Sequence, residues 1–330
     1  MRTMCWLMFI FSMWMATGCW DRQEIEQRST VLAIGLDPVQ TQDGPEIVQV
    51  TVQIAIPGQI PLGPSSGGTG GGTAAGNNTV TVLKTEGKSL ADSMENLRRK
   101  LEYPLFLGQL RMVVVNRKVA ESGLSDLTDF LRRNPDVRRL VWLVVSEGQA
   151  EQALSAIPRL EPVPALYFTN FFDQAATRGR LPFIPLGRFW SVAASEGQDP
   201  VLPLIHVQND QMSITGLALF DKDRMVGALQ GSDVDSYLQA AGVNRGNDFL
   251  TFPSPQEPDE QIGIRIRNRS STIRVRQNED GRIAARINIT LEGDVESRHG
   301  TAQLDLIEEL SKIEQATADT LHHDIIKMIE

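Results

Sequence analysis

The chain has 330 residues, of which 41% are hydrophobic and 22% are charged, and its formal net charge at neutral pH is −9. This length predicts two folded domains, and the acidic balance gives no chain-wide electrostatic footprint for a nucleic acid partner. The chain has only two cysteines, Cys5 and Cys19, which excludes a disulfide framework and a four-cysteine zinc site.

Residues 1–18 have the pattern of a signal peptide: a short positive start, then an apolar run too short for a membrane-spanning helix. The run closes on the small residues Ala16, Thr17 and Gly18, directly before Cys19. This arrangement resembles the lipobox of bacterial lipoproteins, although that family usually has leucine at the position of Ala16. The resemblance implies that Cys19 becomes the first residue of the mature chain and carries S-diacylglyceryl and N-acyl groups.

Two other interpretations of the leader stay open. It could be an ordinary secretory signal with a chance cysteine, or an N-terminal anchor that is not cleaved. The physical chemistry of lipid anchors agrees with the lipoprotein interpretation, because two acyl chains attach a protein stably whereas one binds only marginally. A diacylglyceryl group on Cys19 supplies two chains at once.

Strand and helix patterns alternate through the first half of the mature chain. Residues 47–56 alternate apolar and polar side chains, which predicts a strand with one solvated face, in a hairpin with a strand at 30–37. Residues 140–145 are continuously apolar, which predicts a strand buried on both faces. Further strands are predicted at 79–85 and 109–115, and helices at 89–101, 125–134 and 149–156. Together these elements predict a mixed-sheet α/β domain over residues 19–195.

Residues 62–79 are rich in glycine. The segment lacks the order of a phosphate-binding loop, G-x-x-x-x-G-K-[ST], and no helical pattern follows it. A flexible surface loop is the expectation.

We expect residues 196–211 to be a connector, within a stretch rich in Pro, Gly and Ser at 182–203, and residues 212–330 to form a C-terminal α+β domain. The predicted elements are a hairpin at 212–220 and 225–229, a helix at 233–241, two long antiparallel strands around a turn at Asp280-Gly281, and a long helix from about residue 301. The last helix reaches Glu330 without a terminating Gly, Asn or Pro. The chain could end on a helix, or the domain could be truncated at its C-terminal end, which is the expectation. The predicted fold class is α+β, with more than one domain.

Catalytic patterns are missing from the sequence. The four histidines are scattered, neither H-E-x-x-H nor G-x-S-x-G occurs, and the mature chain has no free thiol. We therefore expect no enzymatic activity, no metal site and no cofactor.

Arginine alternates with isoleucine and valine in the two long strands. If these strands pair, their arginines lie on one exposed face of an otherwise acidic protein. The candidate face comprises Arg265, Arg267, Arg274, Arg276, Arg282 and Arg286. Two interpretations stay open: a solvated face that keeps the protein soluble, and a docking face for anionic lipid headgroups or an acidic partner.

Six blocks in chain order resemble the Ger(x)C spore germination lipoproteins. They read GCWDRQEIEQRSTVLAIGLD, TEGKSLADSMENL, LGQLRMVVV, DFLRRNPDVR, EPVPA and ITGLALFDKDRMVGAL. The resemblance implies a non-enzymatic C-subunit of a GerA-type nutrient germinant receptor, with a mixed α and β fold in several small domains. It also implies a chain anchored through Cys19 on the extracytoplasmic face of the membrane, in the spore the inner membrane. There it would act beside two integral membrane partners, the A and B subunits.

Two alternatives to this function remain. A lipid-anchored solute-binding protein of a transporter would need two lobes of repeated strand–helix units around a polar cleft. A cell-wall hydrolase would need a nucleophile with its base, or a metal set, and the sequence shows neither.

Overall fold

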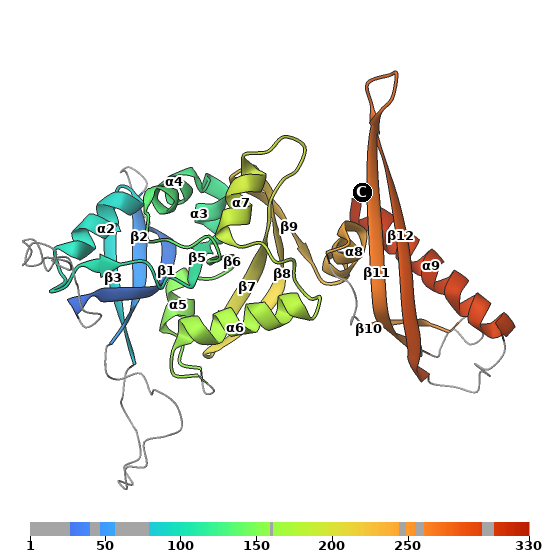
Figure 1. The fold of residues 1–330 in the computed structure, drawn as a ribbon, viewed down its shortest axis with the longest axis horizontal. Helices are drawn as coiled ribbons and strands as arrows, with labels where there is room; N and C mark the ends of the chain where they lie inside the picture. Colours follow the sequence, from blue (N-terminus) through green and yellow to red (C-terminus); the bar gives the residue numbers. More distant parts are fainter. Residues whose placement is uncertain are drawn as a thin grey trace, which may run out of the picture.

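The computed structural model describes residues 27–39, 47–56, 79–158, 161–243, 249–254, 261–298 and 307–329. In these residues two bodies follow one another along the chain, each with its own β-sheet (Figure 1). The first sheet mixes parallel and antiparallel strands, and the second is antiparallel. The predicted α+β class with more than one domain is confirmed.

The first sheet has nine strands, in the order β3-β2-β1-β5-β6-β7-β8-β9, with the short β4 beside β1. Its central strands β1, β5, β6 and β7 run parallel, and the strands on both sides join them antiparallel. The bounds are β1 Ser29–Val39, β2 Ile47–Ala55, β3 Val80–Gly87, β4 Leu105–Phe106, β5 Met112–Asn116, β6 Trp142–Ser146, β7 Val201–Gln208, β8 Gln211–Asp221 and β9 Arg224–Gln230.

Helices cover both faces of this sheet: α2, α3, α4 and α7 on one side, α5 and α6 on the other (Figure 1). The bounds are α2 Leu90–Arg98, α3 Arg117–Ser122, α4 Ser125–Arg133, α5 Ala150–Ser155, α6 Pro164–Thr177 and α7 Leu186–Ala193. Along β5, Val113 and Val115 face the first helix layer, while Met112 and Val114 face the second. Because both faces are covered, β5 and β6 are buried at every position. The buried strand predicted at residues 140–145 is thus confirmed from residue 142 onward.

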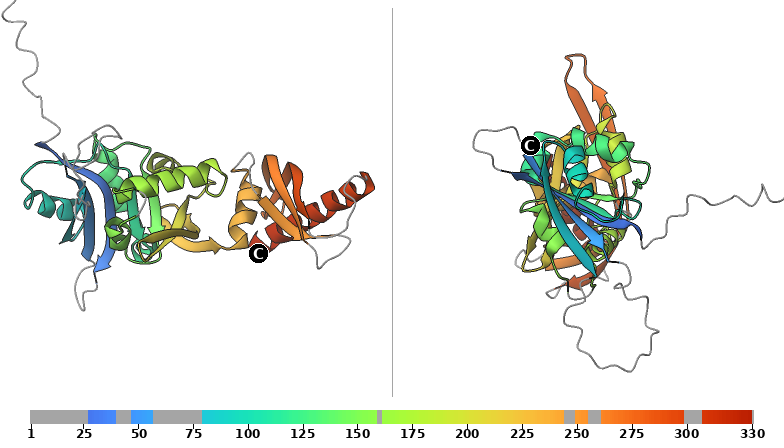
Figure 2. Two further views of the ribbon diagram at one scale, coloured as in Figure 1. Left: turned by 90° about the horizontal axis from the view of Figure 1, so that it is seen from below. Right: turned by 90° about the vertical axis from the view of Figure 1, so that its left-hand side faces the viewer.

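The second body contains a three-stranded sheet in the order β10-β11-β12, with α8 and α9 beside it. The bounds are α8 Ser232–Ala241, β10 Phe249–Pro253, β11 Gln261–Gln277, β12 Ile283–Arg298 and α9 Ile307–Ile329. Ile262 of β11 and Ile313 of α9 form its small buried core. β11 and β12 pair over nearly their whole length, and the turn end of this hairpin projects beyond both helices (Figure 1, Figure 2).

The stretch expected to be a connector is structured. β7 lies within residues 196–211 and occupies a place in the first sheet between β6 and β8, and α7 precedes it. Pro185 lies at the N-cap of α7, where its missing N–H costs no hydrogen bond, so the Pro-rich composition marks a helix start rather than a linker. The strands on both sides of the expected connector therefore belong to one sheet. Where the chain divides into independently folding domains stays a prediction, and the glycine-rich residues 62–78 lie outside the described residues.

Candidate functional site

The predicted lipid attachment site lies outside the described residues. Cys19 and the lipobox residues Ala16, Thr17 and Gly18 all precede residue 27, where the described part of the chain begins. Lipidation of Cys19 stays a prediction. Among the described helices, none is long and apolar enough to cross a membrane.

The six predicted arginines all lie on the β11–β12 hairpin, and they fall into two groups. In the inner half, next to β10, the arginines are paired with carboxylates. The Arg265 guanidinium donates two hydrogen bonds to Glu296, with N–O distances of 2.5 and 2.7 Å, and Arg267 forms an ion pair with Asp294. The hydrogen bond from Arg265 lowers the pKa of the Glu296 carboxyl. The inner arginines, Arg265 and Arg267, are therefore neutralised by carboxylates of the hairpin and link its two strands.

In the outer half, three of the four predicted arginines have no carboxylate partner among the residues that the structure describes. Arg274 lies directly opposite Arg286 in the strand register, and Arg276 is two residues further along the same face. Within the described part of the chain, no ion pair joins Arg274, Arg276 or Arg286 to a carboxylate. The Nε atom of Arg282, in the turn, lies 3.6 Å from the Oδ2 atom of Asp280. We call Arg274, Arg276 and Arg286 the outer arginines.

The opposite face of the outer hairpin is apolar and exposed. Ser271 of β11 contacts α8 through a hydrogen bond from its hydroxyl to the carbonyl of Ala240. The same face continues beyond the helices, where Ile273 is 51% exposed, Val275 63% and Ile283 76%. The outer half of the hairpin is therefore a two-sided ribbon, with isoleucine and valine on one face and arginine on the other.

A second polar feature lies at the carboxyl ends of the parallel strands, and the sequence patterns did not reveal it. Asp37 of β1, Asn116 of β5 and Ser146 of β6 lie side by side in the register, on the face toward α5. The Asp37 carboxylate accepts hydrogen bonds from the backbone N–H groups of Ala150, at 2.6 Å, and Glu151, at 2.9 Å. Burial raises the pKa of Asp37, although these two hydrogen bonds oppose the shift.

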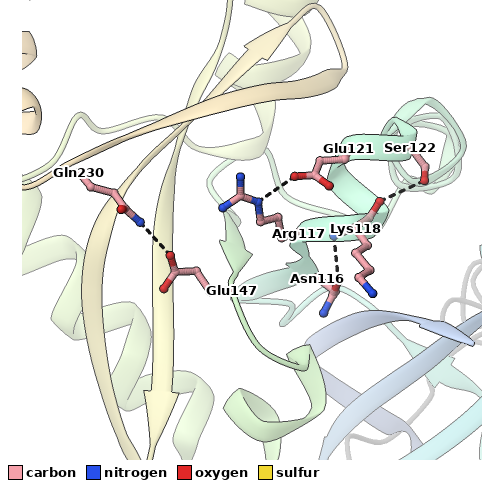
Figure 3. A network of polar contacts seen from close by, with 7 residues as sticks. All are labelled: Asn116, Arg117, Lys118, Glu121, Ser122, Glu147 and Gln230. Atoms are coloured by element: carbon pink, nitrogen blue, oxygen red, sulfur yellow. Dashed lines mark hydrogen bonds and ion pairs between the residues drawn. The ribbon is translucent and has the colours of Figure 1, made fainter. Parts of the chain in front are cut away.

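Figure 3 shows contacts of Asn116, one member of this row, and of residues near it. The Asn116 side-chain oxygen accepts from the backbone N–H of Lys118 at 2.9 Å and so caps α3. Beyond it, Gln230 of β9 donates to Glu147 at 2.9 Å. Ligands of α/β proteins commonly bind at the carboxyl ends of parallel strands. Here the backbone N–H groups at the start of α5 are bound to the Asp37 carboxylate. Asp37 therefore holds α5 against the sheet, and its carboxylate is not open to a ligand.

Other site chemistry is limited. In the residues that the structure describes, no group of three or more His, Cys, Asp or Glu side chains could hold a metal ion. A cleft of about 460 Å³ lies between α7 and the end of α8, and its lining includes Phe183, Arg188 and Tyr237. Burial raises the pKa of Tyr237. The cleft is large enough for a small molecule.

Comparisons with known proteins cover almost the whole chain. The family model described as the spore germination protein N-terminal domain matches residues 21–207. A second model, described as spore germination B3/GerAC-like, C-terminal, matches residues 215–330. The Bacillus subtilis (strain 168) protein YfkR, which is described as a spore germination protein, is 26% identical over 321 residues, covering 95% of this chain and 79% of YfkR.

Spore germination protein KC of the same organism is 23% identical over 341 residues, covering 97% of this chain and 81% of that protein. Among solved structures, the crystal structure of the GerBC protein has a similar fold, with a TM-score of 0.50 at 15% identity over 92% of this chain and 83% of that one. Family models that match both parts of the chain confirm the resemblance seen in the sequence. The chain belongs to the Ger(x)C family of spore germination proteins.

Proposed function

We propose that this chain is the lipid-anchored, non-catalytic C-subunit of a germinant receptor, needed for the response of dormant spores to nutrients. The family match carries the proposal, because it spans residues 21–207 and 215–330. The first matched residue follows Cys19 by two positions, so the apolar leader and the lipobox precede the family domain. This placement supports a leader that is removed and a cysteine that is kept.

The proposed anchor gives the chain its location. Two acyl chains on Cys19 attach a protein stably to a membrane. Export by the signal peptide places it on the extracytoplasmic face, which in the spore is the outer face of the inner membrane. The proposed partners are the integral membrane A and B subunits of the receptor, and the chain needs no cofactor for this role.

The anchor is tested by metabolic labelling with a fatty-acid analogue. We expect the wild-type protein to be labelled and Cys19→Ala to carry no label, because the acylated thiol is gone. Cys5→Ala is the matched control: it removes the only other cysteine, which lies in the leader, and should be labelled like the wild type. Spores that carry Cys19→Ala should germinate more slowly with nutrients than spores that carry Cys5→Ala.

Three results would contradict three separate parts of the proposal. Label retained in Cys19→Ala would remove the anchor but leave the receptor role standing. A pull-down from spore membranes that recovers no polytopic partner, together with normal germination of spores lacking the chain, would remove the receptor role. Strong thermal stabilisation by an amino acid or a sugar would favour the solute-binding alternative.

A further inference from the structure

We infer that the edge of the large sheet at the amino ends of β1, β5 and β6 binds the anionic headgroups of a phospholipid membrane. The cations that carry this role, here called the basic edge, are Lys100, Arg111, Arg138 and Arg139. All four lie within residues 21–207, the part matched by the model of the N-terminal domain. The inference goes beyond the proposed function, because binding through the folded domain requires neither an acylated cysteine nor a role in germination.

Hydrogen bonds bring segments that are distant in the sequence together at this edge. The first backbone N–H of β1 donates to the carbonyl of Pro104 at 2.9 Å, and the first N–H of β6 donates to the carbonyl of Arg111 at 2.9 Å. The N–H of Gly187, in α7, donates to the carbonyl of Arg139 at 2.9 Å. Because β1, β5 and β6 run parallel, the residues that precede them lie at the same edge of the sheet.

The segments that meet at this edge are strongly basic. Residues 98–111, 132–141 and 178–188 together contain eleven lysines and arginines and only two carboxylates, Glu102 and Asp136. The whole chain, in contrast, has a net charge of −9. A local concentration of positive charge on an acidic protein is complementary to an anionic surface outside the chain.

Carboxylates neutralise arginines that flank the basic edge but not the basic edge itself. Arg98 forms an ion pair with Glu95 at 3.3 Å, and Asp129 pairs with both Arg132 and Arg133. The four cations of the basic edge are all exposed, and the ion pairs among the described residues include none of them. Their positive charge is therefore not balanced by a carboxylate within the described part of the chain.

Exposed apolar side chains at the same edge indicate the kind of anionic partner. Leu140 directly follows Arg139 and is 71% exposed, Phe183 beside Trp142 is 48% exposed, and Tyr103 is 41% exposed. A nucleic acid duplex supplies phosphates but presents no apolar layer to Leu140. A membrane interface presents phosphates and acyl chains close together, and aromatic side chains are favoured at that depth. An anionic membrane therefore matches both the cations and the apolar residues.

The path of the chain favours the same orientation. Cys19 precedes the first residue of β1 by ten positions, and ten residues span at most about 35 Å. The carboxyl end of β1 lies a further eleven residues of strand away, again about 35 Å. A lipid on Cys19 would thus hold the basic edge nearer to the membrane than the opposite edge. In the left view of Figure 2, β1 begins at the upper side of the large sheet and the second body does not extend above that side, so a planar surface can approach it.

The test reads the environment of the basic edge directly. The full chain carries Cys5→Ala, Cys19→Ala and Leu140→Cys, so that the only thiol is at position 140, and a polarity-sensitive fluorophore is attached there. We expect a blue shift of the fluorescence on vesicles with about one third phosphatidylglycerol, and none on pure phosphatidylcholine. Added salt should reverse the shift, because it screens exposed charges. Residues 1–18 are common to all variants, so any attachment that they cause does not change the comparison.

A matched position on the other side of the sheet locates the effect. Ile157 is 75% exposed, and its backbone N–H donates to Asp210 in the turn that follows the carboxyl end of β7. The same fluorophore at Ile157→Cys, in place of position 140, should show no shift on either kind of vesicle.

A matched pair of triple variants tests the charge. Glutamine replaces three residues of the basic edge in one variant, namely Arg111, Arg138 and Arg139. This variant should move the equilibrium between bound and free protein about 100-fold toward free, because each cation near an anionic surface contributes roughly a factor of five. The second variant removes the same charge near the carboxyl ends of the strands, through glutamine at Lys88, Arg117 and Lys118. It should leave the shift at position 140 unchanged.

Four results would overturn the inference. An equal shift on neutral and anionic vesicles would show that the cations do not take part. An equal shift at positions 140 and 157 would show that no particular face meets the lipid, and equal weakening by both triple variants would show that only the net charge counts. A shift caused by polyglutamate or DNA but not by vesicles would identify a different anionic partner. Because the tested chain has no Cys19, failure of the acyl anchor leaves all of these readouts unchanged.

Discussion

The large sheet and the outer hairpin place the same residue types in opposite environments. In the large sheet, helices cover both faces, and side chains such as Val114, Leu143 and Phe172 are completely buried. In the outer hairpin, Ile273 and Val275 lie between polar or charged neighbours, and these two residues and Ile283 remain exposed. Burial of apolar surface is the dominant favourable contribution to folding. The large sheet therefore supplies most of the stability, while the outer hairpin contributes little.

The largest expected effect follows from this difference. Phe172 of α6 is fully buried, and its ring centroid lies 5.3 Å from that of Trp142 in β6. Phe172→Ala removes this contact and leaves a cavity, so we expect the free energy of unfolding to fall by about 3–5 kcal/mol. Chemical denaturation followed by tryptophan fluorescence measures the change.

The matched substitution in the hairpin is Ile283→Ala, where the side chain is already 76% exposed. Little surface is taken from water there, so the free energy of unfolding should change by less than about 0.5 kcal/mol. A loss of several kcal/mol for Ile283→Ala would break the comparison, because the outer hairpin would then belong to the folded core.

The two regions also differ in the burial of their charged groups, because Asp37 of the large sheet is buried whereas the outer arginines of the hairpin are exposed. Substitution of Asp37 tests the role of the buried charge. Asp37→Asn keeps the size of the side chain but leaves one backbone N–H of α5 without its acceptor, which should cost about 1–3 kcal/mol at neutral pH. Burial raises the pKa of Asp37 above its usual 3.8, with the nearby Glu151 adding to the shift and Asn116 opposing it. The folded state then binds the proton more tightly than the unfolded state does.

The sign of the pH dependence follows from this difference in proton binding. The contribution of a raised pKa to stability is complete below 3.8 and is lost as the pH rises through the folded-state pKa. The wild type should therefore be more stable relative to Asp37→Asn at pH 3 to 4 than at pH 7, which denaturation at several pH values measures. An advantage that shrinks on acidification would mean that the pKa of Asp37 is lowered, and the burial argument would be wrong.

The sequence patterns predicted part of what depends on neighbours along the chain. The solvated face predicted for residues 47–56 is wrong, because Thr51 and Gln53 are buried, and Gln53 is hydrogen-bonded to α5 and α6. Continuous apolar residues gave the buried strand β6, and the alternation in the long strands placed Arg274, Arg276 and Arg286 on one face. The patterns could not show which arginines are paired, because a register shift between Ile266 and Asn268 changes the alternation between the two halves of the hairpin.

Long-range contacts and unusual helices were beyond the patterns. Asp37 contacts the start of α5 across more than 100 residues, so no spacing rule links them. A signal did exist, since each of the buried strands β1, β5 and β6 has a polar residue at or near its carboxyl end. Helix α6 was not predicted because Phe168, Phe171 and Phe172 place aromatic residues around more than one face, which weakens the helical periodicity.

The smallest expected effect concerns the like-charge pair of the outer hairpin. Arg274→Glu places a carboxylate opposite Arg286, replacing repulsion by attraction, so the hairpin should become more stable by about 0.5–1 kcal/mol. In the inner half, Arg267→Glu puts a second carboxylate beside Asp294 and should destabilise the hairpin by a similar amount. Hydrogen–deuterium exchange of the β11 and β12 amides measures both changes. If Arg274→Glu destabilised the hairpin as Arg267→Glu does, the outer arginines would have partners within the fold. A gain in stability would instead show that the facing arginines repel each other and that the native pair is kept at a cost to folding.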